Sequence, residues 1–357
     1  MASKLKYFVH YKDLMKILHC PNNISGTPRA LAELERENGF ESLSISTSLI
    51  EIDGPSDKIS KPNKVSKIFF RLKYFCLALI RFDIINCHAG ASLLPLNLDL
   101  PFLKLFGKKV IFHYYGSEVR LLKLSKSINP FFSLLGKDEK HKSFLDLKKI
   151  LKLKWHSLWV NAALAPRDTN YFVSYCYSKS VEGSLWCGNI FVSDIEKQFS
   201  EFKDQKSIPT IIHCPTNRAT KGSDYVKKTI DKLLQDGYKF KYIEKEKIER
   251  EKLLQIIYEE VDIVLDQFLV GSFGNLALET LALGKVSVSY LNETLCKDFS
   301  DDCPIVSASV ESLYDVLSEL IPNQARRVEI SKLGKVYIKA NLDKQEIMRR
   351  LNQIYVG

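Results

Sequence analysis

Long apolar runs and paired cysteines are what this sequence most clearly lacks. Nowhere in its 357 residues do 18 apolar residues follow one another, since the nearest approach is interrupted by Arg71, Lys73 and Arg81. A membrane-spanning helix is therefore not expected. The eight cysteines are scattered without a C-x-x-C pair, which is typical of reduced thiols rather than of a disulfide framework or a zinc site. The first twenty residues lack the apolar stretch of a signal peptide, so we expect a cytoplasmic location.

The composition is that of an ordinary globular protein, with 45% hydrophobic and 26% charged residues. At roughly 100 to 200 residues per domain, the length predicts two domains. The formal net charge of +10 is unevenly spread, because seven Lys or Arg accompany one acidic residue over 57–82 and ten accompany three over 119–156. Such confinement indicates a basic surface patch.

Short apolar runs alternate with amphipathic stretches along most of the chain. Strands are predicted at 15–19, 43–45, 83–88, 109–115, 208–214, 239–243, 262–266 and 286–290, and helices at 29–37, 64–81, 223–235, 248–259, 275–283 and 344–355. This alternation predicts an α/β fold of βαβ units with mainly parallel sheets. We place one Rossmann-like domain in 1–190, a second in 191–335 and a C-terminal helix in 336–357. In such sheets, ligands bind beyond the carboxyl ends of the strands.

The most informative stretch is VDIVLDQFLVGSFGNLALETLALGK, residues 261–285. A predicted strand ends at Asp266, a loop with two glycines follows, and a helix that carries Glu279 begins near Asn275. A helix N-terminus favours anions, so the loop can hold a phosphate and Glu279 can bind ribose hydroxyls. The alternative is a glycine needed for close packing and a solvated glutamate.

A second loop, HCPTNRATKGSDY, follows the predicted strand at 208–214. Arg218 and Lys221 lie three residues apart in it, and two cations there can stabilise a diphosphate as a leaving group. The alternative is a solvated basic loop with Ser223 or Asp224 as a helix N-cap.

These stretches together resemble a known family. The segments DIINCHAG, VIFHYYGSEVR, PTNRATKG and DQFLVGSFGNLALETLALGK, with the opening MKILHCPNNISGTPRALAELERENGFES, resemble bacterial retaining glycosyltransferases of the GT-B fold, in particular family 4. The resemblance covers most of the chain, and its most specific part is the ALE-x-LALGK core.

The resemblance implies two Rossmann-like domains that face each other across a cleft, with a C-terminal helix that can cross back. The C-terminal domain would hold a UDP- or GDP-sugar donor and the N-terminal domain the acceptor, without a metal or another cofactor. Arg218 and Lys221 would bind the diphosphate, Glu279 the ribose, and Gly26 would lie in the glycine loop near the donor phosphate.

The sequence departs from the family pattern in two places. The first glutamate of the E-x7-E motif would fall at Gly271. We expect either that Asp266 replaces it or that backbone N–H groups of the loop formed by Gly271, Ser272, Phe273, Gly274 and Asn275 hold the sugar. The family often has His directly before Gly in the acceptor domain, whereas this chain reads His113, Tyr114, Tyr115 and Gly116.

Two histidines are candidates for the catalytic site on the acceptor side. His88 ends a predicted buried strand and meets Ala89 and Gly90, a loop able to approach substrate, and His113 lies on the neighbouring strand. For both, the alternative is a core histidine that bonds backbone carbonyls. Glu118 is read as an exposed first-turn acid in preference to an acceptor contact.

The two basic segments combine Lys and Arg with Phe, Leu and Trp, as suits the surface of an anionic bilayer. Lys64, Lys67, Arg71, Lys123 and Lys126 are the predicted acceptor and membrane residues. The alternative is a basic helix whose apolar stripe packs on the sheet. Nucleic-acid binding is not expected, because no recognised module is present.

We therefore predict a cytoplasmic enzyme, peripheral on the inner face of the cell membrane, that makes surface polysaccharide or another glycoconjugate. It would transfer a sugar from a nucleotide diphosphate donor to a saccharide acceptor, with a lipid-linked saccharide as the leading candidate. In a retaining transferase of this kind the leaving diphosphate takes the acceptor proton. The alternatives are a GT-B-fold sugar-nucleotide epimerase or hydrolase, and a degenerate transferase that binds without catalysis.

Overall fold

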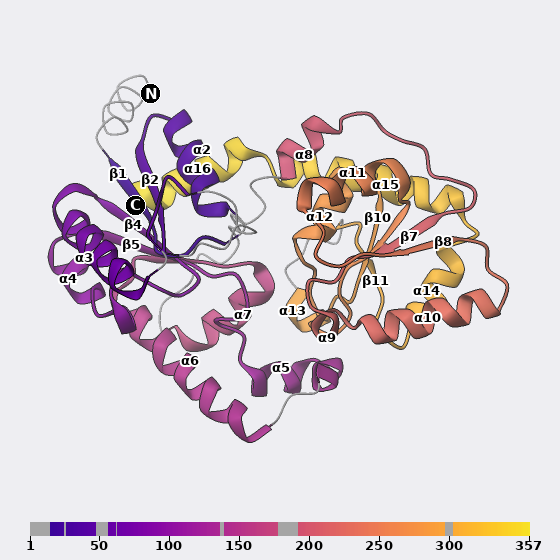
Figure 1. Ribbon diagram of the computed structural model, residues 1–357, viewed down its shortest axis with the longest axis horizontal. Coiled ribbons are helices and arrows are strands. Elements are labelled where there is room, and N and C mark those ends of the chain that lie inside the picture. The colour runs from indigo at the N-terminus through magenta and orange to yellow at the C-terminus, as the bar shows by residue number, and fades with distance from the viewer. Residues whose placement is uncertain are drawn as a thin grey trace. The chain divides into compact units, whose positions relative to one another are not determined.

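The computed structural model describes residues 15–24, 26–47, 56–61, 63–135, 139–177, 192–296 and 303–357. These residues belong to two compact units, which are coloured by sequence in Figure 1. Unit 1 comprises Met1–Leu121, Leu145–Ile190 and Lys344–Gly357, and unit 2 comprises Leu122–Phe144 and Phe191–Asp343.

The sheet of unit 1 is entirely parallel, in the order β3-β2-β1-β4-β5-β6. Its strands are β1 (Lys16–Cys20), β2 (Glu41–Ser46), β3 (Lys58–Ile59), β4 (Ile84–His88), β5 (Lys109–His113) and β6 (Ala162–Leu164). Its helices are α2 (Thr27–Glu37), α3 (Lys64–Arg81), η2 (Pro95–Asn97), α4 (Leu100–Leu105), α7 (Arg167–Cys176), α16 (Lys344–Val356) and most of α6 (Glu139–Trp159). The strand order reverses between β1 and β4, so the loops after these strands form the topological switch point.

The sheet of unit 2 is also parallel, in the order β11-β10-β9-β7-β8. Its strands are β7 (Thr210–His213), β8 (Lys241–Glu244), β9 (Ile263–Leu265), β10 (Val286–Ser289) and β11 (Val306–Ser307). Its helices are α5 (Leu122–Ile128), η3 (Pro130–Leu135), α8 (Val192–Gln198), α9 (Arg218–Lys221), α10 (Ser223–Gln235), α11 (Arg250–Glu260), α12 (Asn275–Ala282), α13 (Glu293–Cys296), α14 (Leu313–Leu320) and α15 (Gln324–Asn341). Here the order reverses between β7 and β9.

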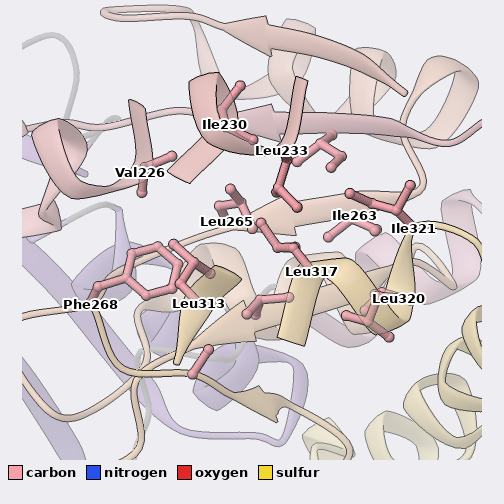
Figure 2. Close-up of a cluster of buried hydrophobic side chains, with 14 of the residues drawn as sticks. Val226, Ile230, Leu233, Ile263, Leu265, Phe268, Leu313, Leu317, Leu320 and Ile321 are labelled. Carbon is pink, nitrogen blue, oxygen red and sulfur yellow. The ribbon is translucent and has the colours of Figure 1, made fainter. Parts of the chain in front are cut away.

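The core of unit 2 lies between its strands and the helices α10 and α14 (Figure 2). Val226, Ile230 and Leu233 recur at helical spacing on α10 and meet Ile263 and Leu265 of β9, and all of these side chains are buried. This packing holds the carboxyl ends of β7 and β9 in place.

The sequence and the structure agree on the elements that matter for the site. The helix predicted at 64–81 is α3 and the helix predicted at 223–235 is α10, with the same bounds. The final predicted helix is α16, which belongs to unit 1 and lies beside α2 in Figure 1, where Tyr355 donates a hydrogen bond to Glu35 over 2.5 Å.

The segment Leu122–Phe144 differs from the domain limits that we predict from the sequence, because it groups with unit 2. Two asparagines attach it there, since Asn129 Nδ2 donates to the Leu269 carbonyl over 3.0 Å and Asn292 Nδ2 donates to the Ile128 carbonyl over 2.9 Å. The ring of Phe131 also packs edge-on against Tyr290, with the ring centroids 5.1 Å apart.

Candidate functional site

At the switch point of unit 2, a lysine, an aspartate and a glycine form a tight cluster. Lys221 Nζ forms an ion pair with Asp266 Oδ1, and the Gly274 N–H donates to Asp266 Oδ2 over 2.7 Å. A Cβ at residue 274 would lie 3.1 Å from Asp266 Oδ2 and 3.3 Å from Lys221 Nζ. These short distances explain why a glycine, which has no Cβ, occupies this position. Both oxygens of Asp266, which is 2% exposed, therefore have partners in the protein.

Arg218, in the same loop, pairs with acidic side chains. Its Nη1 contacts Glu244 Oε1 and lies 2.7 Å from Glu246 Oε1. The hydrogen bonds that Arg218 donates to Glu244 and Glu246 raise the pKa of Arg218 above its usual value. The guanidinium is 38% exposed, so an incoming anion can compete with the two glutamates for it.

Glu279 is buried on α12 and accepts hydrogen bonds from Arg250, the first residue of α11. Arg250 Nε and Nη2 donate to the same oxygen, Oε1, over 2.8 and 2.6 Å. Within the described part of the chain, no hydrogen bond reaches Oε2 of Glu279. The sequence analysis did not single out Arg250, although this residue lies in the first turn of the helix predicted at 248–259, after a strand and a loop at the carboxyl edge of the sheet.

The N-terminus of α12 has no side-chain cap. The Asn275 Oδ1 atom there is buried and finds no hydrogen-bond donor among the described residues. Together with the uncapped first turn, this atom indicates a place that a polar ligand can complete, as a phosphate or sugar does at helix N-termini.

The loop before α12 is closely packed. Ser272 and Phe273 are buried, and Gln267 Nε2 donates to the Ser272 carbonyl. Gly271 has φ +82°, and a Cβ there would lie 2.9 Å from both Asn129 Nδ2 and Asn292 Cβ. The segment that carries Asn129 thus fills the space that a side chain at residue 271 would need.

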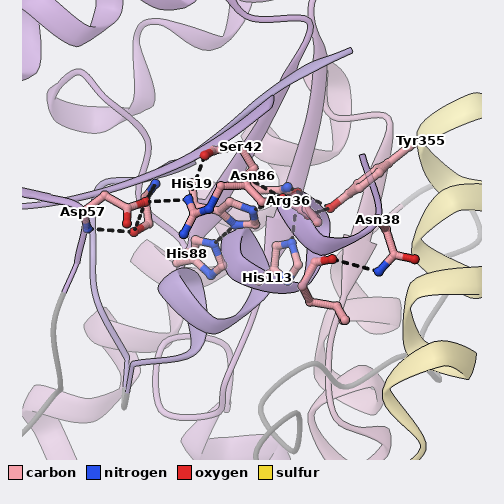
Figure 3. A network of polar contacts seen from close by, with 12 residues as sticks. His19, Arg36, Asn38, Ser42, Asp57, Asn86, His88, His113 and Tyr355 are labelled. Atoms are coloured by element: carbon pink, nitrogen blue, oxygen red, sulfur yellow. Dashed lines mark hydrogen bonds and ion pairs between the residues drawn. The ribbon is translucent and has the colours of Figure 1, made fainter. Parts of the chain in front are cut away.

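In unit 1, the two candidate histidines belong to a buried polar network (Figure 3). His88 is 0% and His113 is 3% exposed, and their rings stack with centroids 4.5 Å apart. Burial lowers the pKa of His113 to about 3 and that of His88 well below its usual value, with neighbouring histidines adding to both shifts. Both imidazoles are therefore neutral near pH 7 and neither is exposed enough to meet a substrate. The exposed end of the network is Tyr115, whose Oη lies 2.7 Å from His88 Nδ1.

Gly26 and Glu118 lie in two loops of unit 1, and both form hydrogen bonds within the protein. Gly26, with φ 72°, is the N-cap of α2, and its N–H donates to Asn23 Oδ1 over 3.1 Å. Glu118 accepts hydrogen bonds from the N–H groups of Tyr115 and Gly116, over 2.5 and 3.0 Å. Glu118 therefore fixes the turn after β5.

The five basic residues predicted to contact acceptor or membrane separate into two groups. Lys64, Lys67 and Arg71 lie on α3 in unit 1, whereas Lys123 and Lys126 lie on α5 in unit 2. Arg71 bonds the carbonyls of Leu93 and Ser92 over 2.7 and 2.6 Å, so it anchors the loop after β4.

Two kinds of feature are absent from the described residues. None of these residues forms a group of three or more His, Cys, Asp and Glu placed to hold a metal ion. The seven described cysteines have free thiols, and Cys187 lies outside the described residues. Over the same part of the chain, no helix combines the length and hydropathy needed to cross a bilayer.

No protein-family model and no curated protein sequence matches the chain. Several solved structures, however, match the chain over nearly its whole length. Sucrose-phosphate synthase from Thermosynechococcus elongatus matches with a TM-score of 0.63 and 13% identity, over 96% of this chain and 98% of that one. HepE from Anabaena, in complex with UDP-glucose, matches with a TM-score of 0.58 and 12% identity, over 95% and 100%. A glycosyltransferase from Rickettsia africae matches with a TM-score of 0.60 and 12% identity, over 96% and 97%. The two parallel-sheet α/β units of this chain thus have the GT-B fold.

Proposed function

We propose that the protein is a glycosyltransferase that moves a sugar, with retention, from a nucleotide diphosphate donor to a saccharide acceptor. The observation that carries this proposal is the switch point of unit 2, where Arg218, Lys221, Glu279 and the uncapped α12 lie at one sheet edge. The same fold in HepE is seen with UDP-glucose, which supports a UDP-sugar as donor over a GDP-sugar.

The residues at this edge suggest how the donor would be held. The diphosphate would lie at the first turn of α12, where Asn275 and the backbone N–H groups of the turn can bind its oxygens. Arg218 and Lys221 would supply positive charge as the diphosphate leaves, and Glu279 Oε2 would accept a hydrogen bond from ribose.

In the absence of a donor, acidic side chains would take the place of the diphosphate beside the cations at this edge. Glu244 and Glu246 neutralise Arg218, and Asp266 neutralises Lys221, until a diphosphate replaces them. Binding then exchanges one set of charge-assisted hydrogen bonds for another. The acceptor proton would pass to the departing diphosphate on the same face, so no pair of catalytic carboxylates is needed.

A thermal-shift panel of uridine, guanosine, adenosine and thymidine diphosphates with their sugars tests the donor site. A ligand at about 100 times its Kd stabilises the fold by about 2.7 kcal/mol. Glu279→Ala should weaken binding of the selected nucleotide by more than about 1 kcal/mol, as a lost charged hydrogen bond does. The matched control is Glu259→Ala on α11, which should bind as the wild type does. Equal affinities in all three proteins would remove Glu279 from the site.

Assays of the bound donor distinguish the remaining alternatives. Turnover without an acceptor would favour an epimerase or hydrolase, and nucleotide binding without turnover would favour a degenerate partner subunit. The crowding of Gly271 by Asn129 and Asn292 is compatible with the degenerate form, because it leaves little space for a carboxylate side chain at that position.

The acceptor would be lipid-linked and the enzyme would bind an anionic bilayer through α3. Of the 18 residues of this helix, only Tyr74 and Ala78 are buried. Several of its apolar side chains are nevertheless exposed, among them Phe69 at 68% and Ile80 at 82%, so this part of its apolar surface is not covered by the sheet.

A second apolar surface adjoins this helix. Phe75 of α3 contacts Phe102 of α4, with ring centroids 6.2 Å apart. Five exposed apolar side chains lie on η2, α4 and their ends, namely Leu96, Leu98, Phe102, Leu105 and Phe106. The sequence from 58 to 82 contains no acidic residue, so the charge around the stripe attracts anionic lipid headgroups.

Sedimentation with vesicles that contain phosphatidylglycerol tests this surface. The combined change Phe69→Ser and Leu105→Ser should abolish binding, whereas Leu234→Ser on α10, also an exposed leucine, should not. Lys64→Glu with Lys67→Glu should weaken binding. High salt should do the same, since exposed charges are screened over about 8 Å at physiological ionic strength. Wild-type binding in the Phe69 and Leu105 variant would contradict the assignment.

A further inference from the structure

A segment from the first half of the sequence packs against the loop that leads into α12. This segment, residues 122–135, comprises α5 and η3, and we call it the arm. The arm groups with unit 2, although Leu121 before it and Leu145 after it belong to unit 1. The loop, residues 267–274, lies between β9 and α12 at the switch point of unit 2. The surroundings of this switch point are therefore not built from one continuous stretch of the chain.

Asn129 is the residue of the arm that reaches the loop. It is 0% exposed, its Nδ2 donates to the Leu269 carbonyl over 3.0 Å, and its Oδ1 accepts from the Phe131 N–H over 3.0 Å. A buried amide group needs partners for its donor and its acceptor, so these two bonds fix its orientation. The bond to Phe131 stays within the arm, whereas the bond to Leu269 crosses to the loop. Asn129 thus joins the backbone of the arm to the backbone of the loop.

Asn292, which follows β10, completes a triangle of contacts around the loop. Its backbone N–H donates to the Gly271 carbonyl over 3.0 Å, and its Nδ2 donates to the Ile128 carbonyl of the arm over 2.9 Å. A Cβ at Gly271 would lie 2.9 Å from both Asn129 Nδ2 and Asn292 Cβ, so the three segments are in close contact. Hydrogen bonds among three packed segments restrict the loop to one arrangement.

The same loop contacts both parts of the proposed donor site. At one end, the Phe268 N–H donates to the Lys221 carbonyl over 3.3 Å. A Cβ at Gly222, the residue after α9, would lie 3.4 Å from Phe268 Cβ and 3.3 Å from Leu269 Cγ, so the loop packs on the end of α9. At the other end, Gly274 is the N-cap of α12. A shift of Leu269 would therefore move the chain at Lys221 relative to the first turn of α12.

We propose that Asn129 is a positioning residue for the donor site. Its hydrogen bond to Leu269 keeps the loop in the arrangement that places Lys221 and the first turn of α12 for a diphosphate. Asn129 acts through the loop and does not itself touch the donor. The inference rests on the proposed function, since it assumes that a nucleotide diphosphate binds at this edge, and it adds to that function a requirement for the arm.

The first experiment asks whether Asn129 restrains the loop in the free, full-length protein. Hydrogen–deuterium exchange with mass spectrometry compares peptides that contain 267–274 in the wild type and in Asn129→Ala. We expect these peptides to exchange about three- to tenfold faster in the variant, since local opening no longer breaks the bond to Leu269. Peptides from β4 and β5 of unit 1 should exchange as in the wild type. Unchanged exchange in the loop would overturn the proposal whether or not the protein binds a nucleotide.

The second experiment measures by calorimetry the affinity for the nucleoside diphosphate that the thermal-shift panel selects, with UDP as the first probe. Asn129→Ala should bind it about three- to tenfold more weakly, because the binding-competent arrangement of the loop is less populated. Asn129→Asp has nearly the same shape and keeps an oxygen for the Phe131 N–H, but it loses the donor to Leu269. It should weaken binding by at least as much.

Asn323→Ala is the matched control in the same unit. Asn323 is the N-cap of α15, and its Oδ1 accepts from the Arg326 N–H over 3.0 Å. Loss of this cap should lower the urea midpoint and leave the affinity for the diphosphate unchanged. A purely structural role of Asn129 would give the same pattern.

The outcomes separate this proposal from the function on which it rests. Equal affinities in the wild type and both Asn129 variants would overturn the proposal and leave the proposed function standing. Wild-type affinity in Asn129→Asp but not in Asn129→Ala would assign the effect to packing, which also overturns the proposal. If the wild type binds no nucleotide of the panel, the proposed function is wrong, and the positioning role is wrong with it even where exchange shows that Asn129 restrains the loop.

Discussion

The carboxyl edges of the two sheets differ in the polar groups that they carry. In unit 1, Tyr115 and His88 at this edge begin a network of imidazoles, hydroxyls and one buried carboxylate that are joined by hydrogen bonds. In unit 2 the edge carries two cations: Arg218 pairs with Glu244 and Glu246 close to solvent, and Lys221 pairs with the buried Asp266. The two units share an architecture but differ in what their switch points can bind.

The difference follows from burial. The network of unit 1 tolerates deep burial because its polar groups are hydrogen-bonded to one another, and Glu35 contacts His19, Ser42 and Tyr355. Exposed ion pairs are weak and exchange readily, which suits a site that must take up and release an anion. A buried hydrogen-bonded network suits the recognition of uncharged polar groups, where the direction of each hydrogen bond decides the fit.

The largest effect should come from removing the buried carboxylate of unit 1. Glu35→Ala leaves His19, Ser42 and Tyr355 without their common acceptor. We expect the free energy of unfolding to fall by about 3–5 kcal/mol, as when one partner of a buried pair is removed. Urea unfolding measures this change, with Glu33→Ala, an exposed glutamate on the same helix, as a control expected within about 0.5 kcal/mol. Similar values for both variants would mean that the network does not stabilise unit 1.

A smaller effect should come from a substitution at Gly271, in the loop before α12. Gly271 and Gly237 have nearly the same φ, +82° and +87°. A Cβ at Gly271 would be crowded, whereas a Cβ at Gly237 would meet nothing within 4 Å. Gly271→Ala should cost about 1–3 kcal/mol more than Gly237→Ala, the range for overpacking. Urea unfolding of both variants separates the contact with Asn129 from the backbone strain that they share. Equal costs would show that the segment with Asn129 does not constrain the loop.

The neutral histidines should make stability depend on pH. The folded pKa of His113 is about 3, because of burial and the nearby His19, whereas an unfolded histidine has a pKa of about 6.5. The unfolded state therefore binds more protons between these values. The stabilisation is fully present above about pH 6.5 and is lost as the pH falls toward 3.

For His113 alone the loss should be about 1.4 kcal/mol per pH unit below pH 6.5. Urea midpoints at several pH values measure the slope. His113→Gln keeps a donor for Asn86 and should reduce the slope by that amount. An unchanged slope would mean that His113 titrates normally in the folded protein.

Much of the fold could be predicted from the sequence, because its periodicity reflects local burial. Helix α3 and the strands β4 and β10 lie where the pattern predicts them. The short strands β3, β6 and β11 have only two or three residues, too few to show a period.

The candidate site could be predicted less well, since it depends on contacts between distant residues. The position of Lys221 in the loop after a predicted strand indicates that it lies at the edge of the sheet. Only the folded chain shows that Asp266 neutralises it. The histidines were found at strand ends, yet their burial and their link to Tyr115 depend on Glu35 and on Tyr355 near the C-terminus. Nothing in the local sequence of Gly271 indicates that Asn129 packs against it.

The smallest effect on stability should come from the exposed ion pairs of unit 2. Arg218→Ala removes the contacts with Glu244 and Glu246, and exposed pairs contribute at most about 1 kcal/mol. We expect the free energy of unfolding to change by less than this amount. The difference should shrink further when sodium chloride screens the charges, whereas the cost of Glu35→Ala should not depend on salt because Glu35 is buried. Urea unfolding of both variants at low and high salt measures the two responses. If Arg218→Ala lowered the free energy of unfolding strongly and independently of salt, Arg218 would be a residue that stabilises the fold, and not one that is available to bind an anion.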